Sequence, residues 1–302
     1  MIEVSGITKT YRSRGTIVKA LDGLDFSAAR GEVFGIIGPD GAGKTSLFRI
    51  LTTLLTPDAG SARVNGLDTV KDYRAIRQVV GYMPGRFSLY QDLSVEENLR
   101  FFAAIFGVSI EANYSLIDDI YRQLEPFRTR KAGQLSGGMK QKLALCCALI
   151  HQPLVLFLDE PTTGVDAVSR KEFWEMLHRL KGKGITILVS TSYMDEAGLC
   201  DRVALLQNGR LLSVDTPAQI RRNFGKPLWA VKARETFRLL PALKAAAAVD
   251  SCYPFGQYYH VVLQPDKGRD ELEALLREGD FTEVDIHPAE PGIEDCFIAL
   301  MK

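Results

Sequence analysis

The sequence predicts an α/β fold with a buried parallel sheet, a helical insertion and a smaller α+β domain at its C-terminal end. Two short apolar runs, residues 32–37 and 154–158, are suited to buried strands of such a sheet. Between residues 47 and 55, apolar residues recur at helical spacing. This alternation of strand and helix patterns indicates the α/β class.

The chain divides into two parts at a linker. Residues 223–227, Asn-Phe-Gly-Lys-Pro, are rich in turn-forming residues. We therefore expect one domain over residues 1–224, with a mostly helical insertion at about residues 87–150, and a second domain over residues 228–302. The second part alternates strand and helix patterns in an order that suits a split β-α-β arrangement, and it has no cluster of catalytic residues.

The composition restricts the classes of partner. The 37 Lys and Arg residues balance the 37 Asp and Glu residues, so the net charge gives no reason to expect nucleic acid as a partner. The N-terminus lacks the features of a secretory signal, and no apolar run approaches the roughly 18 residues of a membrane span. Cysteines without C-x-x-C spacing fit reduced thiols. A cytoplasmic chain is therefore expected.

A glycine-rich loop follows the first buried strand. Its spacing is G-x-x-x-x-G-K-[ST], and a helix pattern comes directly after it. Glycines let the backbone turn sharply and bring its N–H groups close to phosphate oxygens, while the helix N-terminus favours the same anion. Lys44 would reach the β and γ phosphates, and the Thr45 hydroxyl would bind Mg²⁺. The predicted nucleotide-binding residues are Gly38, Pro39, Asp40, Gly41, Ala42, Gly43, Lys44, Thr45 and Ser46.

Tyr11 lies upstream of this loop, within residues 1–37, where short apolar runs alternate with turns as in several antiparallel strands. Aromatic side chains most often serve packing. Next to a phosphate loop, a flat ring that stacks on a base is the better interpretation of Tyr11.

The helical insertion has its own signals. Ser94 with Glu97 three residues later forms a capping box, which predicts a helix up to Phe106, and a second helix is expected at residues 116–124. A Ser-Gly-Gly sequence then precedes an apolar helix. It is a common helix cap, but it can also bind an anion through backbone N–H groups, a hydroxyl and the helix dipole. The candidate residues are Leu135, Ser136, Gly137, Gly138 and Met139.

Two carboxylates, Asp159 and Glu160, follow the apolar strand at residues 154–158. The carboxyl end of a central parallel strand usually faces a ligand. Asp159 therefore suits a role at Mg²⁺, and Glu160 suits a base that polarises an attacking water. The alternative is that acidic residues merely terminate the strand.

In this order, residues 38–46, 135–141 and 154–160 resemble the motifs of nucleotide-binding subunits of ATP-binding cassette (ABC) transporters, a resemblance that covers about residues 1–220. With residues 193–197, they are most similar to the bacterial drug-efflux branch. The resemblance implies a P-loop NTPase core of the RecA-like type with antiparallel strands, and ATP and Mg²⁺ as cofactors. By position it implies that Tyr11 stacks on adenine and that Glu160 is the catalytic base. It implies that phosphate and Mg²⁺ are held by Lys44, Thr45 and Ser46.

The resemblance also implies partners. In this family two cassette subunits close head to tail around ATP, so Ser136, Gly137 and Gly138 would serve the ATP of the opposite subunit, and Asp166 would lie at the dimer interface. Closure drives a separate transmembrane permease, which would hold the chain at the inner face of the cell membrane. We expect an apolar and aromatic groove for the permease near residues 86–92, and a dimerisation or regulatory role for the C-terminal domain.

Two positions depart from the family pattern. Gly85 stands where a glutamine usually touches Mg²⁺ and the attacking water, and Ser192 stands where a histidine usually contacts the γ phosphate. Glycine has no amide side chain, and a hydroxyl lacks the reach and charge of an imidazole. Cys147, at a position where arginine is common, is a smaller departure. One hypothesis is an ATP site that binds better than it hydrolyses; the other is that the family tolerates these changes.

Two other functions remain open from the sequence. One is a non-transport cassette protein that acts on ribosomes or DNA as a nucleotide-gated clamp, which the balanced charge disfavours. The other is a regulatory ATP-binding module without hydrolysis, which the retention of Lys44, Asp159 and Glu160 disfavours. We therefore expect an ATP-hydrolysing subunit of an ABC exporter.

Overall fold

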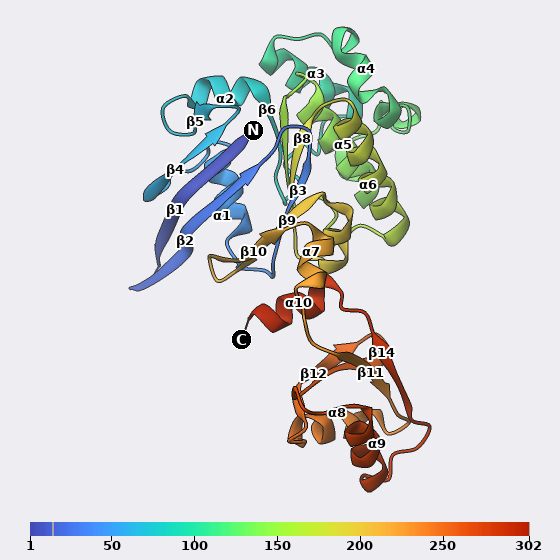
Figure 1. Cartoon of the computed structure of the whole chain (residues 1–302). Coiled ribbons are helices and arrows are strands. Elements are labelled where there is room, and N and C mark those ends of the chain that lie inside the picture. The colour runs from blue at the N-terminus through green and yellow to red at the C-terminus, as the bar shows by residue number, and fades with distance from the viewer. Residues whose placement is uncertain (14, 302) are drawn as a thin grey trace. The chain divides into compact units, whose positions relative to one another are not determined.

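The computed structural model describes residues 1–13 and 15–301 (Figure 1). Contacts within the chain form two compact units, residues 1–217 and residues 218–300. Among the described residues, no helix has both the length and the apolar character that a membrane span requires.

The first unit is built on a six-stranded sheet in the order β10-β9-β3-β8-β7-β6. All neighbours from β9 to β6 are parallel, and only β10 pairs antiparallel to its neighbour. The strands β3, β7 and β8 are buried at every residue, as expected of apolar runs that are covered on both faces. The six strands are Val33–Ile37 (β3), Val80–Met83 (β6), Val155–Asp159 (β7), Thr186–Thr191 (β8), Arg202–Gln207 (β9) and Arg210–Asp215 (β10).

A second, antiparallel sheet contains the N-terminus and has the order β2-β1-β4-β5, which confirms the antiparallel strands expected there. Helix α1 (Lys44–Leu51) contacts strands of both sheets, and its Phe48 meets Phe157 of β7 edge to face with ring centroids 5.9 Å apart. One buried apolar core thus joins the two sheets. The strands of this sheet are Ile2–Ser13 (β1), Thr16–Ala28 (β2), Ala59–Val64 (β4) and Leu67–Asp68 (β5).

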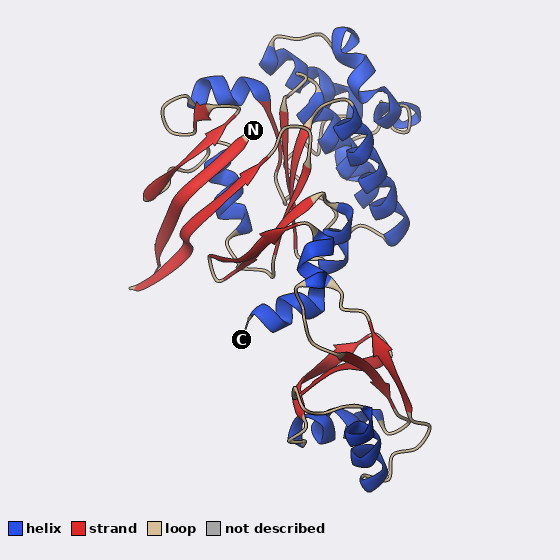
Figure 2. Cartoon of the chain, viewed as in Figure 1, coloured by secondary structure: helices blue, strands red, loops and turns tan. Residues whose placement is uncertain are grey.

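The helices within residues 95–182 lie mainly on the side of the six-stranded sheet away from the antiparallel sheet, whereas the helix at Tyr73–Val79 contacts β5 and β6 (Figure 2). The predicted capping box at Ser94 is confirmed, with reciprocal bonds between Ser94 and Glu97. Helix α4 begins at Ile110, before the expected start at residue 116, and ends at Tyr121, before the expected end at residue 124. Within its first turns, Asn113 donates a tertiary hydrogen bond of 2.6 Å to the carbonyl oxygen of Ile150. The elements are Tyr73–Val79 (α2), Val95–Phe106 (α3), Ile110–Tyr121 (α4), Gly137–Leu149 (α5) and Ala167–Gly182 (α6), with 3₁₀ helices at Glu125–Phe127, Ala132–Gln134 and Met194–Leu199.

The second unit begins within helix α7 (Pro217–Arg222), before the linker expected at residues 223–227. The thiol of Cys296 donates a weak hydrogen bond of 3.6 Å to the carbonyl oxygen of Ile220 in this helix. The antiparallel sheet has the order β12-β13-β11-β14, which is the predicted split β-α-β arrangement. Its elements are Leu228–Lys232 (β11), Thr236–Ala245 (α8), Val249–Phe255 (β12), Tyr258–Leu263 (β13), Arg269–Glu278 (α9), Asp285–Ala289 (β14) and Ile293–Leu300 (α10).

Candidate functional site

The glycine-rich loop connects β3 to α1, as the sequence predicts. Two of its glycines are required by packing as well as by any ligand: a Cβ at Gly38 would lie 2.1 Å from the carbonyl oxygen of Leu206, and one at Gly43 would lie 2.3 Å from that of Ala20. Gly41 has open space around it but a φ of +80°, which L side chains rarely adopt. Helix α1 has no side-chain cap, so its first N–H groups can bind phosphate oxygens.

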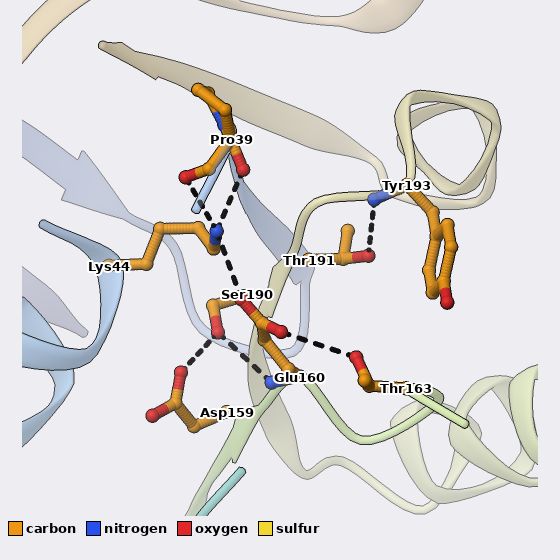
Figure 3. A network of polar contacts seen from close by, with 9 residues as sticks. Pro39, Lys44, Asp159, Glu160, Thr163, Ser190, Thr191 and Tyr193 are labelled. Carbon is orange, nitrogen blue, oxygen red and sulfur yellow. Dashed lines mark hydrogen bonds and ion pairs between the residues drawn. The ribbon is translucent and has the colours of Figure 1, made fainter. Parts of the chain in front are cut away.

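Lys44 lies at the centre of this loop. Its side chain is only 3% exposed, and its Nζ donates to the carbonyl oxygens of Gly38 at 2.7 Å and Pro39 at 3.0 Å. The same Nζ lies 3.0 Å from Oε1 of Glu160 (Figure 3). The structure therefore brings the lysine of the phosphate loop and the predicted catalytic base into direct contact.

Asp159 ends strand β7 and is 2% exposed. Burial raises the pKa of its carboxyl, and the hydroxyls of Ser190 and Thr45 oppose this shift by hydrogen bonding to the charged form. Mg²⁺ prefers oxygen ligands, usually one or two carboxylates completed by substrate phosphates and water. The described residues contain no cluster of three or more His, Cys, Asp or Glu side chains suited to a metal. The Asp159 carboxylate and the Thr45 hydroxyl are oxygen groups of the kind that Mg²⁺ binds.

Glu160 adopts a left-handed backbone conformation, with φ of +50°. Its N–H donates to the carbonyl oxygen and to the hydroxyl of Ser190, at 3.0 and 3.1 Å. Its Oε2 accepts a hydrogen bond of 3.2 Å from the hydroxyl of Thr163. A non-glycine residue in this conformation needs support from its surroundings and is often found at active sites.

Tyr11 lies on β1 beside the start of α1. Its hydroxyl is 3.1 Å from Oγ of Ser46, and the residue is 38% exposed. The ring is thus tied to the phosphate loop at its polar end and remains accessible to a planar ligand.

Ser136 and Asp166 cap two neighbouring helices. Ser136 begins α5 and accepts from the N–H of Met139 at 3.3 Å, whereas Oδ1 of Asp166 accepts from two N–H groups at the start of α6. These N–H groups lower the pKa of the Asp166 carboxyl, so it is ionised. A Cβ at Gly138 would lie 2.9 Å from Oγ of Ser169, so the two helix starts adjoin each other. Ser136, Gly137 and Asp166 are exposed, and the side chains of Ser136 and Asp166 accept hydrogen bonds from N–H groups of their own helices.

The family model described as ABC transporter matches residues 21–163, which include the phosphate loop and both carboxylates. The probable multidrug ABC transporter ATP-binding protein YbhF of Escherichia coli is 41% identical over 100% of this chain and 52% of its own length. The doxorubicin resistance ATP-binding protein DrrA of Mycobacterium tuberculosis is 33% identical over 99% of this chain and 93% of its own length. The chain belongs to the ABC transporter family.

Solved structures agree with this assignment. An ATP-binding subunit of an ABC transporter has a TM-score of 0.66 at 30% identity, over 74% of this chain and 93% of that chain. A dimeric cassette in a post-hydrolysis state, bound to ADP and Pi, has a TM-score of 0.65 at 25% identity, over 72% of this chain and 98% of that chain. The predicted P-loop NTPase fold of an ABC cassette is thus confirmed. This cassette chain spans about half the length, 52%, of YbhF.

The two positions that depart from the ABC pattern, Gly85 and Ser192, follow the carboxyl ends of strands β6 and β8. A Cβ at Gly85 would approach the carbonyl oxygen of Asp159 to 3.0 Å and Cβ of Glu160 to 3.7 Å. Ser192 directly follows β8 and is half-buried. Each position therefore adjoins the site while lacking the usual amide or imidazole.

Sequence reasoning missed one residue of this ABC site, Ser190. Its hydroxyl donates to Oδ1 of Asp159 at 2.5 Å and accepts from the N–H of Glu160. The available signal was a serine near the end of a buried apolar strand. Burying its hydroxyl costs free energy unless the hydroxyl is hydrogen-bonded, so a partner had to be close by.

A groove of about 440 Å³ lies between the sheet and the helical insertion of the cassette. It occupies the expected region, but of residues 86–92 only Ser88 and Leu89 line it. Its wall is otherwise formed by α2, β6, α3 and α5 and by the residues that follow α1, β6 and α5. The apolar and aromatic lining includes Met83, Leu89, Phe102, Ile105, Phe106 and Cys147.

Proposed function

We propose that this chain is the ATP-hydrolysing subunit of an ABC exporter and powers transport by a separate transmembrane permease. The observation that carries the proposal is the convergence of Lys44, Asp159 and Glu160 at the end of the sheet, with Lys44 Nζ 3.0 Å from Glu160 Oε1. Relatives named as drug-resistance and multidrug ATP-binding proteins support the exporter class.

The residues divide the chemistry between them. Lys44 and the N–H groups of α1 would bind the β and γ phosphates, and Tyr11 would stack on adenine. Thr45 and Asp159 would hold Mg²⁺, which neutralises charge on the phosphates when bound. Glu160 would accept a hydrogen bond from the attacking water and polarise it.

A second cassette subunit would complete the machinery. The exposed Ser136 and Gly137 and the half-buried Gly138 at the start of α5 would bind the ATP held by that subunit, with Asp166 at the interface. The permease would insert an apolar segment into the groove of about 440 Å³, which would place the chain at the inner face of the membrane. We assign the C-terminal domain, residues 228–302, to dimerisation or regulation.

The departures at Gly85 and Ser192 motivate a narrower proposal. The site built on this chain would bind ATP better than it hydrolyses it, while its Ser136-Gly137-Gly138 completes a competent site on a different cassette subunit. Such an asymmetric pair needs a heterodimer.

The test is ATP hydrolysis by the purified chain beside its Glu160→Gln variant, alone and then with copurified cassette and permease partners. Loss of a general base usually costs about 100-fold or more in rate. ATP binding should survive in Glu160→Gln, and Glu175→Gln, at an exposed glutamate of α6, should hydrolyse normally. Turnover by the lone chain that vanishes in Glu160→Gln would indicate a self-sufficient homodimer.

Turnover that appears only when a second, different cassette is added would indicate the asymmetric pair. Turnover that Glu160→Gln leaves unchanged in every preparation would contradict the assignment of Glu160. Failure of the chain to bind ATP would contradict the proposed function as a whole.

A further inference from the structure

Ser190 lies on β8, between the strand that leads to the phosphate loop and the strand that ends in Asp159. The residue is fully buried, at 0% exposure. Its hydroxyl contacts both functional carboxylate residues: Oγ is 2.5 Å from Oδ1 of Asp159 and 3.1 Å from the backbone nitrogen of Glu160 (Figure 3).

The direction of these two hydrogen bonds follows from chemistry. The N–H of Glu160 can only donate, so the oxygen of Ser190 must accept there. The single hydrogen of the hydroxyl is therefore available to the carboxylate of Asp159, which accepts when ionised. The same hydroxyl thus donates a hydrogen bond to Asp159 and accepts one from Glu160.

Each bond has a distinct geometric effect. The bond to Oδ1 restrains the rotation of the Asp159 carboxylate, whose charged form is also hydrogen-bonded by the Thr45 hydroxyl. The bond from the Glu160 N–H to this hydroxyl adds to its bond to the Ser190 carbonyl oxygen, and together they support a backbone with φ of +50°, which a non-glycine residue rarely adopts. That conformation carries the Glu160 side chain to Lys44 and Thr163.

We propose that Ser190 is a positioning residue, which orients Asp159 for Mg²⁺ and holds Glu160 in the turn that aims its carboxylate into the site. The Mg²⁺ part of this inference rests on the proposed function, whereas the Glu160 part does not. Ser190 would touch neither the nucleotide nor the metal and would act through its two neighbours.

The other hydroxyls of β8 provide a matched control. Thr186 is also 0% exposed, and its Oγ1 accepts from the N–H of Gly31 at 2.8 Å, at the opposite end of the strand. A Thr186→Val change therefore removes a buried strand hydroxyl and one hydrogen bond without touching either carboxylate. Any general effect of weakening β8 should appear in this variant as well.

The experiment measures ATP affinity by calorimetry with Mg²⁺ and with EDTA, in the wild-type chain and in Ser190→Ala, Ser190→Thr and Thr186→Val. Ser190→Ala removes only the oxygen, so it fits the buried space, and Ser190→Thr restores a hydroxyl. Outer partners of metal ligands are usually worth about 10- to 100-fold in metal affinity. We expect the gain in ATP affinity from Mg²⁺ to fall by about tenfold in Ser190→Ala and to be largely restored in Ser190→Thr, while Thr186→Val resembles wild type.

Amide hydrogen exchange at residues 159–163 gives a readout that needs neither metal nor nucleotide. The Glu160 N–H keeps its bond to the backbone carbonyl oxygen of residue 190 in every variant, so the loss of its second acceptor should make its exchange measurably, but not maximally, faster in Ser190→Ala than in Thr186→Val. The inference would be overturned if Ser190→Ala and wild type showed the same increase in ATP affinity on adding Mg²⁺ and the same exchange rate of the Glu160 amide. A wild-type chain without any Mg²⁺ gain would instead overturn the metal assignment, and the exchange result would still decide the role of Ser190 toward Glu160.

Discussion

Lys44 and Glu160 form an ion pair at the end of the sheet, with 3.0 Å between Nζ and Oε1, although the two residues come from different strand ends and are assigned to different tasks. The lysine also donates hydrogen bonds to the carbonyl oxygens of Gly38 and Pro39. Its removal therefore leaves these two oxygens and the Glu160 carboxylate without their donor. The pair links the phosphate loop to the carboxylate that would polarise water.

Lys44→Ala is expected to weaken ATP binding by roughly 10- to 100-fold, because hydrogen bonds to charged groups contribute about 1.5–3 kcal/mol each. Calorimetric titration with ATP provides the measurement. Lys142→Ala is the matched control, since Lys142 is 12% exposed and pairs with Glu172 away from the loop. Similar losses in both variants would indicate a general effect on folding instead of phosphate binding.

Ser192→His is expected to raise the steady ATP turnover of the chain by several-fold, because an imidazole can reach and donate to a γ phosphate where the hydroxyl cannot. Gly85→Gln should add to this only if the carbonyl of Asp159 yields slightly, since a Cβ there would be 3.0 Å away. The rates are measured in the single and double variants. Unchanged turnover in Ser192→His would mean that the site tolerates serine.

Tyr11→Ala is expected to lower ATP affinity by about tenfold, since stacking of an aromatic side chain on a base contributes roughly 1–3 kcal/mol. Tyr11→Phe keeps the ring and should retain most of the affinity. Binding of inorganic triphosphate, which has no base, should be unaffected. Tyr73→Ala serves as control, because Tyr73 is equally exposed at 38% but contacts Arg77 instead of the loop. An equal loss for ATP and triphosphate would contradict stacking.

His151 is expected to make the protein less stable in mild acid. Burial lowers the pKa of its imidazole, and contact with the carbonyl oxygen of Val80 opposes this only in part. Below the unfolded pKa of about 6.5, the unfolded chain therefore binds a proton that the folded protein resists, and the free energy of unfolding falls with pH. The same residue stacks on Phe106 at 3.8 Å.

His151→Phe retains an aromatic ring against Phe106 but cannot be protonated. The midpoint of thermal unfolding should therefore drop less between about pH 7.5 and about pH 5.5 in this variant than in wild type. An identical drop in the two proteins would show that other groups account for the acid sensitivity.

Local patterns were sufficient to predict the phosphate loop, the capping box at Ser94 and the two carboxylates, because each depends on residues within one strand-loop-helix or helix start. Ser190 could not be predicted in this way, since its role requires β8 to pair between β3 and β7. The same reason applies to Gly38, whose need for glycine comes from Leu206, far away in the chain. Long-range pairing thus determined what the local patterns could not.

The order β3-β8-β7 sets a fixed spacing within the site. Neighbouring strands lie about 4.8 Å apart, so the backbones of β3 and β7 are separated by about 9.5 Å, a gap that the side chains of Lys44 and Glu160 close to 3.0 Å. Backbone hydrogen bonds maintain this separation, and no side-chain substitution alters it. Strand β8 therefore sets the distance between the backbones of β3 and β7. Substitutions at Gly85 and Ser192 can change the rate of reaction, while this distance stays constant.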